Sequence, residues 1–149
     1  MPDFSTLFLP SKGQPIEYDG RTVMMMHRYS MPPSGRIEIS IVSTSSRWRQ
    51  GIKLSTAGHF LIADQKIAKG LFLWEDTMHP VVVIEVHSKD GVLCVSNAWD
   101  TGDGVAHSWH HGAALYAELQ PDGRTLYYCN DGEPDDDFDD IIFSIRPAA

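Results

Sequence analysis

Five Asp-Gly pairs punctuate the chain, and several of them stand between runs of alternating apolar and polar residues. Asp-Gly favours the positive φ values of tight hairpin turns, because glycine has no Cβ and aspartate can bond its own backbone. Three pairs separate segments with strand character, which predicts three hairpins and an antiparallel β protein. The predicted hairpins join residues 16–18 to 22–29, 81–87 to 92–97, and 113–119 to 125–130.

Other segments extend this pattern. In residues 36–42 the isoleucines Ile37, Ile39 and Ile41 alternate with polar residues, as in a half-buried strand. Residues 63–69 and 110–118 have at most a turn or two of helical character. We therefore expect one all-β domain over residues 1–149, an antiparallel β-sandwich or jelly-roll-like fold of nine or ten short strands. Further strands are predicted at 52–54, 59–63, 70–74 and 140–145.

The charge of the chain is concentrated in one place. The sequence has 12 basic and 20 acidic residues, a net charge of −8, and seven of the acids fall within ten positions. Without them the net charge is −1. The acidic balance argues against nucleic acid and anionic membranes as partners. The seven acids are Asp131, Glu133, Asp135, Asp136, Asp137, Asp139 and Asp140.

The first residues of the sequence and its two cysteines indicate in which cellular compartment we expect the protein. The opening has no basic region before its apolar residues, which Pro10 interrupts, so we expect no signal peptide. The two cysteines, Cys94 and Cys129, fall within strand patterns. These features predict a cytoplasmic protein with two reduced thiols.

The acidic stretch offers oxygen ligands at close spacing. Asp135, Asp137 and Asp139 alternate, and the turn before them adds Asn130 and Asp131. Ca²⁺ takes six to eight oxygens, often from carboxylates spaced in this way. Two other interpretations stay open: a solvated acidic turn that protects an edge strand, or a docking patch for a basic partner protein. The predicted metal ligands are Asp131, Asp135, Asp137, Asp139 and Asp140, with Ca²⁺ as the ion.

Residues 135–143 read D-x-D-F-D-D-I-I-F. This pattern resembles a calcium-associated motif near the end of some secreted bacterial β-sandwich domains, over about ten residues. The resemblance implies that Asp135, Asp137, Asp139 and Asp140 are calcium ligands.

Residues 97–112 gather tryptophan, histidine and aspartate beside glycine-rich turns. Tryptophan faces stack on sugars or aromatic groups, and histidine and aspartate supply hydrogen bonds, so a ligand pocket is one interpretation. A packed loop is another, and on a helical turn His107, His110 and His111 present the spacing of a metal site. The predicted ligand-binding residues are Trp99, Asp100, Asp103, His107, Trp109 and His110.

Two shorter segments also carry charged residues that bear on these sites. Glu75 and Asp76 end a strand pattern and are candidate outer ligands of the acidic site, and Arg47 and Arg49 flank Trp48 as the only compact basic patch. We expect the two arginines to pair with the acidic stretch across the fold.

The sequence contains none of the common nucleophile, phosphate-loop or zinc-protease motifs. The first hypothesis is a non-catalytic binding protein that docks a partner protein, by analogy of size and charge with immunity proteins that neutralise toxins. The alternatives are a Ca²⁺-dependent module for carbohydrate or lipid, and a metal-dependent enzyme that uses His107, His110 and His111 with Asp100 or Asp103.

Overall fold

The computed structural model describes residues 4–12, 14–108, 113–132 and 137–148. Within them, one five-residue helix and ten strands are present, and every strand pair is antiparallel. The elements are α1 (Phe4–Phe8), β1 (Ile16–Tyr18), β2 (Arg21–Val23), β3 (His27–Ser30), β4 (Ser34–Thr44), β5 (Arg49–Ile62), β6 (Gln65–Trp74), β7 (Val81–Asp100), β8 (Ala114–Leu119), β9 (Thr125–Asn130) and β10 (Ile141–Ala148).

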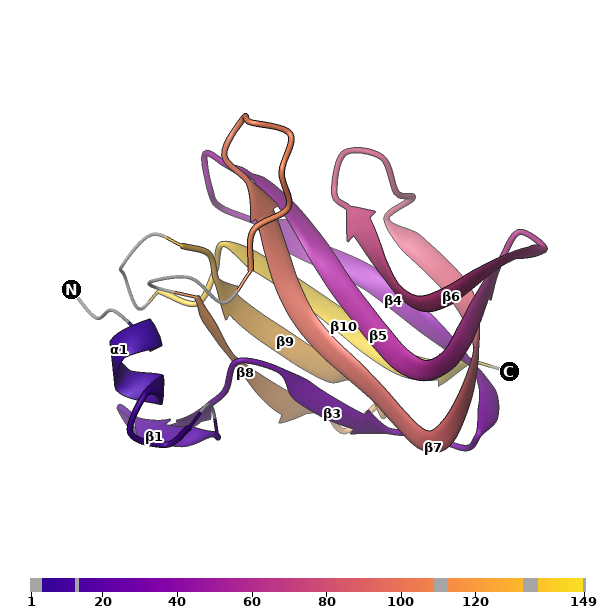
Figure 1. Cartoon of the computed structure of the whole chain (residues 1–149), viewed down its shortest axis with the longest axis horizontal. Helices are drawn as coiled ribbons and strands as arrows, with labels where there is room; N and C mark the ends of the chain where they lie inside the picture. Colours follow the sequence, from indigo (N-terminus) through magenta and orange to yellow (C-terminus); the bar gives the residue numbers. More distant parts are fainter. Residues whose placement is uncertain (1–3, 13, 109–112, 133–136, 149) are drawn as a thin grey trace.

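The strands form a small β1–β2 hairpin and one large sheet in the order β6-β5-β7-β4-β10-β9-β8. β3 pairs with the second half of β7, while β4 pairs with the first half. Figure 1 shows how the large sheet folds over, with β5 and β7 crossing in front of β4, β9 and β10. The all-β, sandwich-like architecture expected from the hairpin pattern is therefore confirmed.

The largest difference from the predicted elements concerns Asp90-Gly91. Residues 81–100 form one bent strand, so the predicted hairpin at this pair is wrong. Gly91 has a positive φ of 70°. However, the Val92 amide donates to Ser88 Oγ (3.2 Å) and to Asp90 Oδ1 (3.1 Å), which closes a local bulge. Both halves of β7 then pair with the same neighbour, β5.

The predicted hairpin at Asp122-Gly123 is present, and the turn at Asp19-Gly20 is present too, but the strand predicted over residues 22–29 is divided by a bend into β2 and β3. Asp19 and Gly20 both have positive φ between β1 and β2, and Gly123 has a φ of 90° between β8 and β9. The weak helical character of residues 63–69 does not give a helical turn, because Ala63 and Asp64, both at positive φ, form the tight turn between β5 and β6. Residues 114–118 likewise belong to strand β8.

Two apolar clusters hold the fold together. The main cluster fills the space inside the large sheet and includes Ile39, Leu54, Val86, Tyr127 and Phe143, each at most 1% exposed. A smaller cluster joins α1 to the large sheet. Its buried members are Phe4, Phe8, Val23, Ala114, Tyr116 and Phe138. Because Phe138 belongs to the acidic stretch, this second cluster fixes that stretch against the N-terminal part of the chain.

Candidate functional site

Gln50 links three of the four polar segments that carry the predicted site residues. Its backbone bonds Glu75 in both directions, from the Gln50 amide to Glu75 Oε2 (3.2 Å) and from the Glu75 amide to the Gln50 carbonyl (2.9 Å). Its side-chain amide donates to Asp131 Oδ2 (3.1 Å). The fourth segment joins through the β5–β7 register, in which Arg49 lies opposite Asp100. We call this part of the molecule the acidic end: residues 45–50, 74–76, 97–108, 130–132 and 137–140.

The Gln50 side chain is fully buried at 0% exposure. Its Nε2 donates to the Trp48 carbonyl (3.2 Å) as well as to Asp131. Its Oε1 has no hydrogen-bond partner among the described residues. A buried amide oxygen without a donor is uncommon in a folded protein, so this atom is a candidate contact for a ligand or cation.

Two of the predicted metal ligands are buried anchors of the acidic stretch. Asp131 is 0% exposed and accepts a bond from Ser46 Oγ (2.6 Å) in addition to the one from Gln50. Asp140 is 5% exposed and accepts from the Asp131 amide at Oδ2 (2.9 Å). The two carboxylates therefore join the beginning of the stretch to its end and to β5.

Asn130 and Phe138 complete the anchoring. Asn130 Oδ1 accepts from the Phe138 amide (2.6 Å), and the Asn130 carbonyl accepts from Asn97 Nδ2 (2.8 Å). Phe138 has a φ of 56°, a backbone conformation that is costly for a bulky residue. Its ring is 1% exposed and packs near Phe4 and Tyr116, so burial in the second cluster offsets this cost.

The remaining predicted metal ligands are placed differently. Asp137 is exposed, Asp139 is half-buried, and Asp135 lies outside the described residues. Within residues 4–12, 14–108, 113–132 and 137–148, no three His, Cys, Asp or Glu side chains are grouped so that they could hold a metal ion.

The predicted pairing of Arg49 with the acidic stretch is wrong. Arg49 Nε bonds both oxygens of Asp76 (2.7 and 2.8 Å), and its guanidinium lies 4.4 Å from the centre of the Trp74 ring. Arg47 lies over the neighbouring Trp48 ring at 5.5 Å. The described residues of the acidic end therefore contain two arginines and eight carboxyl groups, so most of its negative charge is not balanced there.

Trp99 packs the acidic stretch against β7. Its side chain is 2% exposed, and a Cβ built on Gly132 would lie 2.8 Å from its ring. The absence of a side chain at Gly132 is what allows this contact. A ring that is 2% exposed has no face available to a ligand. Trp99 is therefore a packing residue in this structure, and not part of an open ligand pocket.

The loop after Trp99 is closed by its own aspartates. Asp100 Oδ1 accepts from the amides of Gly102 (2.8 Å) and Gly104 (3.1 Å), and Asp103 Oδ2 lies 3.2 Å from His107 Nε2. His107 returns to bond the backbone of Trp99 in both directions, at 2.8 and 3.0 Å. Bonds from the Val105 amide and from His107 lower the pKa of Asp103. Trp109, His110 and His111 lie outside the described residues.

Glu75 is an acid at this end whose charged form is disfavoured. Burial raises its pKa, the bond from the Gln50 amide opposes that shift, and the neighbouring Asp76 carboxylate adds to it. The structure therefore holds a partly desolvated carboxyl directly beside Gln50.

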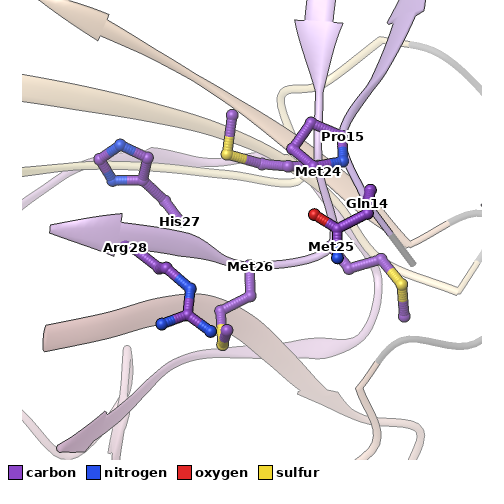
Figure 2. A pocket seen from close by; sticks show the side chains of 7 residues that line it. All are labelled: Gln14, Pro15, Met24, Met25, Met26, His27 and Arg28. Carbon is purple, nitrogen blue, oxygen red and sulfur yellow. The ribbon is translucent and has the colours of Figure 1, made fainter. Parts of the chain in front are cut away.

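An apolar hollow of about 430 Å³ beside β3 was not predicted from the sequence. Figure 2 shows that Met24, Met25 and Met26 line it together with Gln14, Pro15, His27 and Arg28. The three methionines are half-buried, because the chain leaves β2 and bends before β3 begins. The run of three methionines in a strand pattern was the available signal.

Searches of family models, curated proteins and solved structures each found no match for this chain. None of the described helices is long and apolar enough to cross a membrane.

Proposed function

We propose that the protein is a non-catalytic binding protein that docks a basic partner protein on its acidic end. The observation that carries this proposal is the charge of the converging segments. Their described residues contain eight carboxyl groups and two guanidinium groups, a net charge of −6, whereas all the described residues together have a net charge of −4. Such a concentration of one sign speeds and orients the encounter with a partner of the opposite sign.

The anchoring of the acidic stretch supports the same function. Asp131 and Asp140 are buried and hydrogen-bonded, whereas Asp137 and Asp139, which lie between them in the sequence, are exposed and half-buried. The hydrogen bonds of Asp131 and Asp140 fix the backbone of the stretch. Asp137 and Asp139 are carried by this fixed backbone and have side chains that reach solvent. A surface fixed in this way loses little conformational entropy when a partner binds. By analogy of size and charge, toxin-neutralising immunity proteins use acidic surfaces for this purpose.

The test uses a defined cationic probe, a capped decapeptide of alternating lysine and glycine, titrated at low salt while amide NMR signals are recorded. The proposal expects shifts concentrated at residues 45–50, 97–108 and 137–140. The double variant Asp137→Asn/Asp139→Asn should weaken binding several-fold, since it removes two charges from the docking surface. The matched control Glu17→Gln/Glu118→Gln removes two exposed charges elsewhere and should leave binding unchanged. Equal effects of the two double variants, or shifts spread evenly over the surface, would contradict the proposal.

A Ca²⁺-dependent module for carbohydrate or lipid is a second candidate, and Gln50 Oε1 favours it. This buried amide oxygen lacks a donor among the described residues, and the nitrogen of the same amide bonds the Asp131 carboxylate. Hard cations take amide and carboxylate oxygens. Ca²⁺ at 100 times its dissociation constant should stabilise the protein by about 2.7 kcal/mol. Thermal unfolding in millimolar Ca²⁺ and in chelator tests this, and identical curves would remove the candidate.

A further inference from the structure

The wall of the large sheet is open between β3 and β8. Met24, just before β3, exchanges both backbone bonds with Leu115 of β8, at 2.8 and 2.9 Å. Beyond this bridge the two strands separate, and β3 pairs only with β7 while β8 pairs only with β9 among the described residues. We call the opening between residues 27–30 and 116–119 the β3–β8 gap.

The pattern of backbone bonds shows which groups face this gap. The Met31 amide donates to the Gly91 carbonyl (2.9 Å), so Met31 and Gly91 are a hydrogen-bonded pair. Tyr29 and Leu93, two positions further along the same register, lie opposite each other. Bonded and non-bonded positions alternate along an antiparallel strand, so Tyr29 bonds β7 while Arg28 and Ser30 direct their backbone groups into the gap. On β8 the same alternation, counted from Leu115, directs the backbone of Ala117 and Leu119 into the gap.

The gap contains space for a ligand. A hollow of about 470 Å³ is lined by residues 27–30 of β3 and by Ala117 and Leu119 of β8, and also by Gly123, Thr125 and Pro147. It shares His27 and Arg28 with the methionine-lined hollow of about 430 Å³ (Figure 2). Leu119 is 78% exposed, the highest value among the large apolar side chains described.

The groups that line the gap indicate what kind of ligand can bind there. Two strand edges with free N–H and C=O groups are complemented by the alternating donors and acceptors of an extended polypeptide, as in β-strand addition. Methionine side chains adapt to different apolar side chains because they are unbranched and flexible. Arg28 is the permanently charged residue of the lining and complements a carboxylate.

We propose that an extended segment of a partner polypeptide binds in the β3–β8 gap. Its backbone pairs with Arg28, Ser30, Ala117 and Leu119, its apolar side chains lie on Met24, Met25 and Met26, and an acidic side chain faces Arg28. This interaction uses no residue of the acidic end, so it stands or fails independently of the function proposed above.

The experiment begins with a displayed library of nonapeptides that have apolar residues at alternate positions and one fixed glutamate. The tightest peptide is synthesised in its natural form and with N-methyl groups on alternate amides. We expect the natural form to bind and to slow amide hydrogen exchange at Arg28, Ser30, Ala117 and Leu119. The N-methylated form should bind at least about tenfold more weakly, because alternate amides of a strand face the same side and the methylated ones cannot donate to the strand edge that they face.

A matched pair of variants separates backbone pairing from apolar contact. Leu119→Pro removes the N–H that faces the gap, whereas Leu119→Thr removes the apolar side chain and keeps that N–H. Proline is tolerated at this kind of edge position, so both variants should fold. We expect Leu119→Pro to bind the peptide about tenfold more weakly than Leu119→Thr, and the control Phe72→Lys on the β6 edge to bind as the wild type does.

Several outcomes would overturn the proposal. These are a library that yields no binder, equal binding of the N-methylated peptide, equal affinities of the two Leu119 variants, or protection at β6 instead of β3 and β8. Self-association of the free protein that Leu119→Pro abolishes would assign the gap to a second copy of this chain, which also contradicts it.

Discussion

Gln50 and Asp131 are separated by 81 positions in the chain and are joined by a 3.1 Å hydrogen bond between the amide nitrogen and the carboxylate. Neither side chain has any exposed surface. The bond connects β5 to the acidic stretch, so it couples the stability of the sheet to the position of the proposed docking surface.

Replacing Asp131 with alanine should lower the free energy of unfolding by about 2–3 kcal/mol, because its buried carboxyl group accepts two hydrogen bonds and both donors lose a partner. The donors affected are Ser46 Oγ and Gln50 Nε2. Urea unfolding followed by circular dichroism measures the change. The control Asp137→Ala alters an exposed carboxylate of the same stretch and should change stability by less than about 0.5 kcal/mol. Similar losses in both variants would show that Asp131 is not the anchor.

The Gly132→Ala substitution tests the contact with Trp99. The added methyl group would lie 2.8 Å from the indole ring, and overpacking of this kind costs about 1–3 kcal/mol. The same variant should shift the tryptophan fluorescence, since the ring has to move. The control is Gly35→Ala, whose methyl group would lie 3.5 Å from Met31 Cε at ordinary contact distance. If Gly132→Ala is as stable as Gly35→Ala, the close packing of the stretch on Trp99 is refuted.

His27 should make the protein sensitive to acid. Burial lowers the pKa of His27 below its usual 6.5, and Nδ1 lies 2.8 Å from the Tyr127 hydroxyl. Burial also raises the pKa of Tyr127, so the phenol keeps its proton and can donate it to neutral Nδ1. The unfolded chain then binds a proton below pH 6.5 that the folded chain does not bind. This contribution to stability is present above pH 6.5 and is lost as the pH falls through the folded-state pKa.

Unfolding free energies of the wild type and of His27→Gln, measured between pH 7.5 and 4.5, check this expectation. Glutamine can accept the Tyr127 hydrogen bond but does not titrate, so the variant should lose less stability than the wild type on acidification. Parallel pH profiles of the two proteins would rule out His27 as the source of the acid sensitivity.

Phe138→Ala should cost about 3–4 kcal/mol, as expected for a fully buried phenylalanine whose removal leaves a cavity. The ring lies 5.6 Å from Phe4 and 5.2 Å from Tyr116, centre to centre, so its loss also loosens α1. Hydrogen exchange at α1 and at residues 137–140 reports both effects. The control Phe72→Ala removes a ring that is 43% exposed and should cost markedly less. An intact α1 in Phe138→Ala would show that the second cluster does not depend on this ring.

Much of the fold could be predicted because its signals are local. The Asp19-Gly20 and Asp122-Gly123 turns require φ values that these residues adopt easily, and alternation in residues 36–42 specifies which face of the strand is buried. Asp90-Gly91 shows the limit of such signals. The same dipeptide closes a hairpin or a bulge, and pairing of both halves of β7 with β5 decided for the bulge.

The candidate site also has features that could be predicted from the sequence and features that could not. The sequence by itself determined that the polar segments carry most of the charge, because the number of carboxylates does not depend on folding. Only the tertiary structure decided that Asp131 and Asp140 turn inward as anchors while Asp137 turns outward. It alone placed Gln50 between Glu75 and Asp131, and Arg49 on Asp76. These choices depend on contacts between residues far apart in the chain, where burial and the pairing of donors with acceptors outweigh local preference.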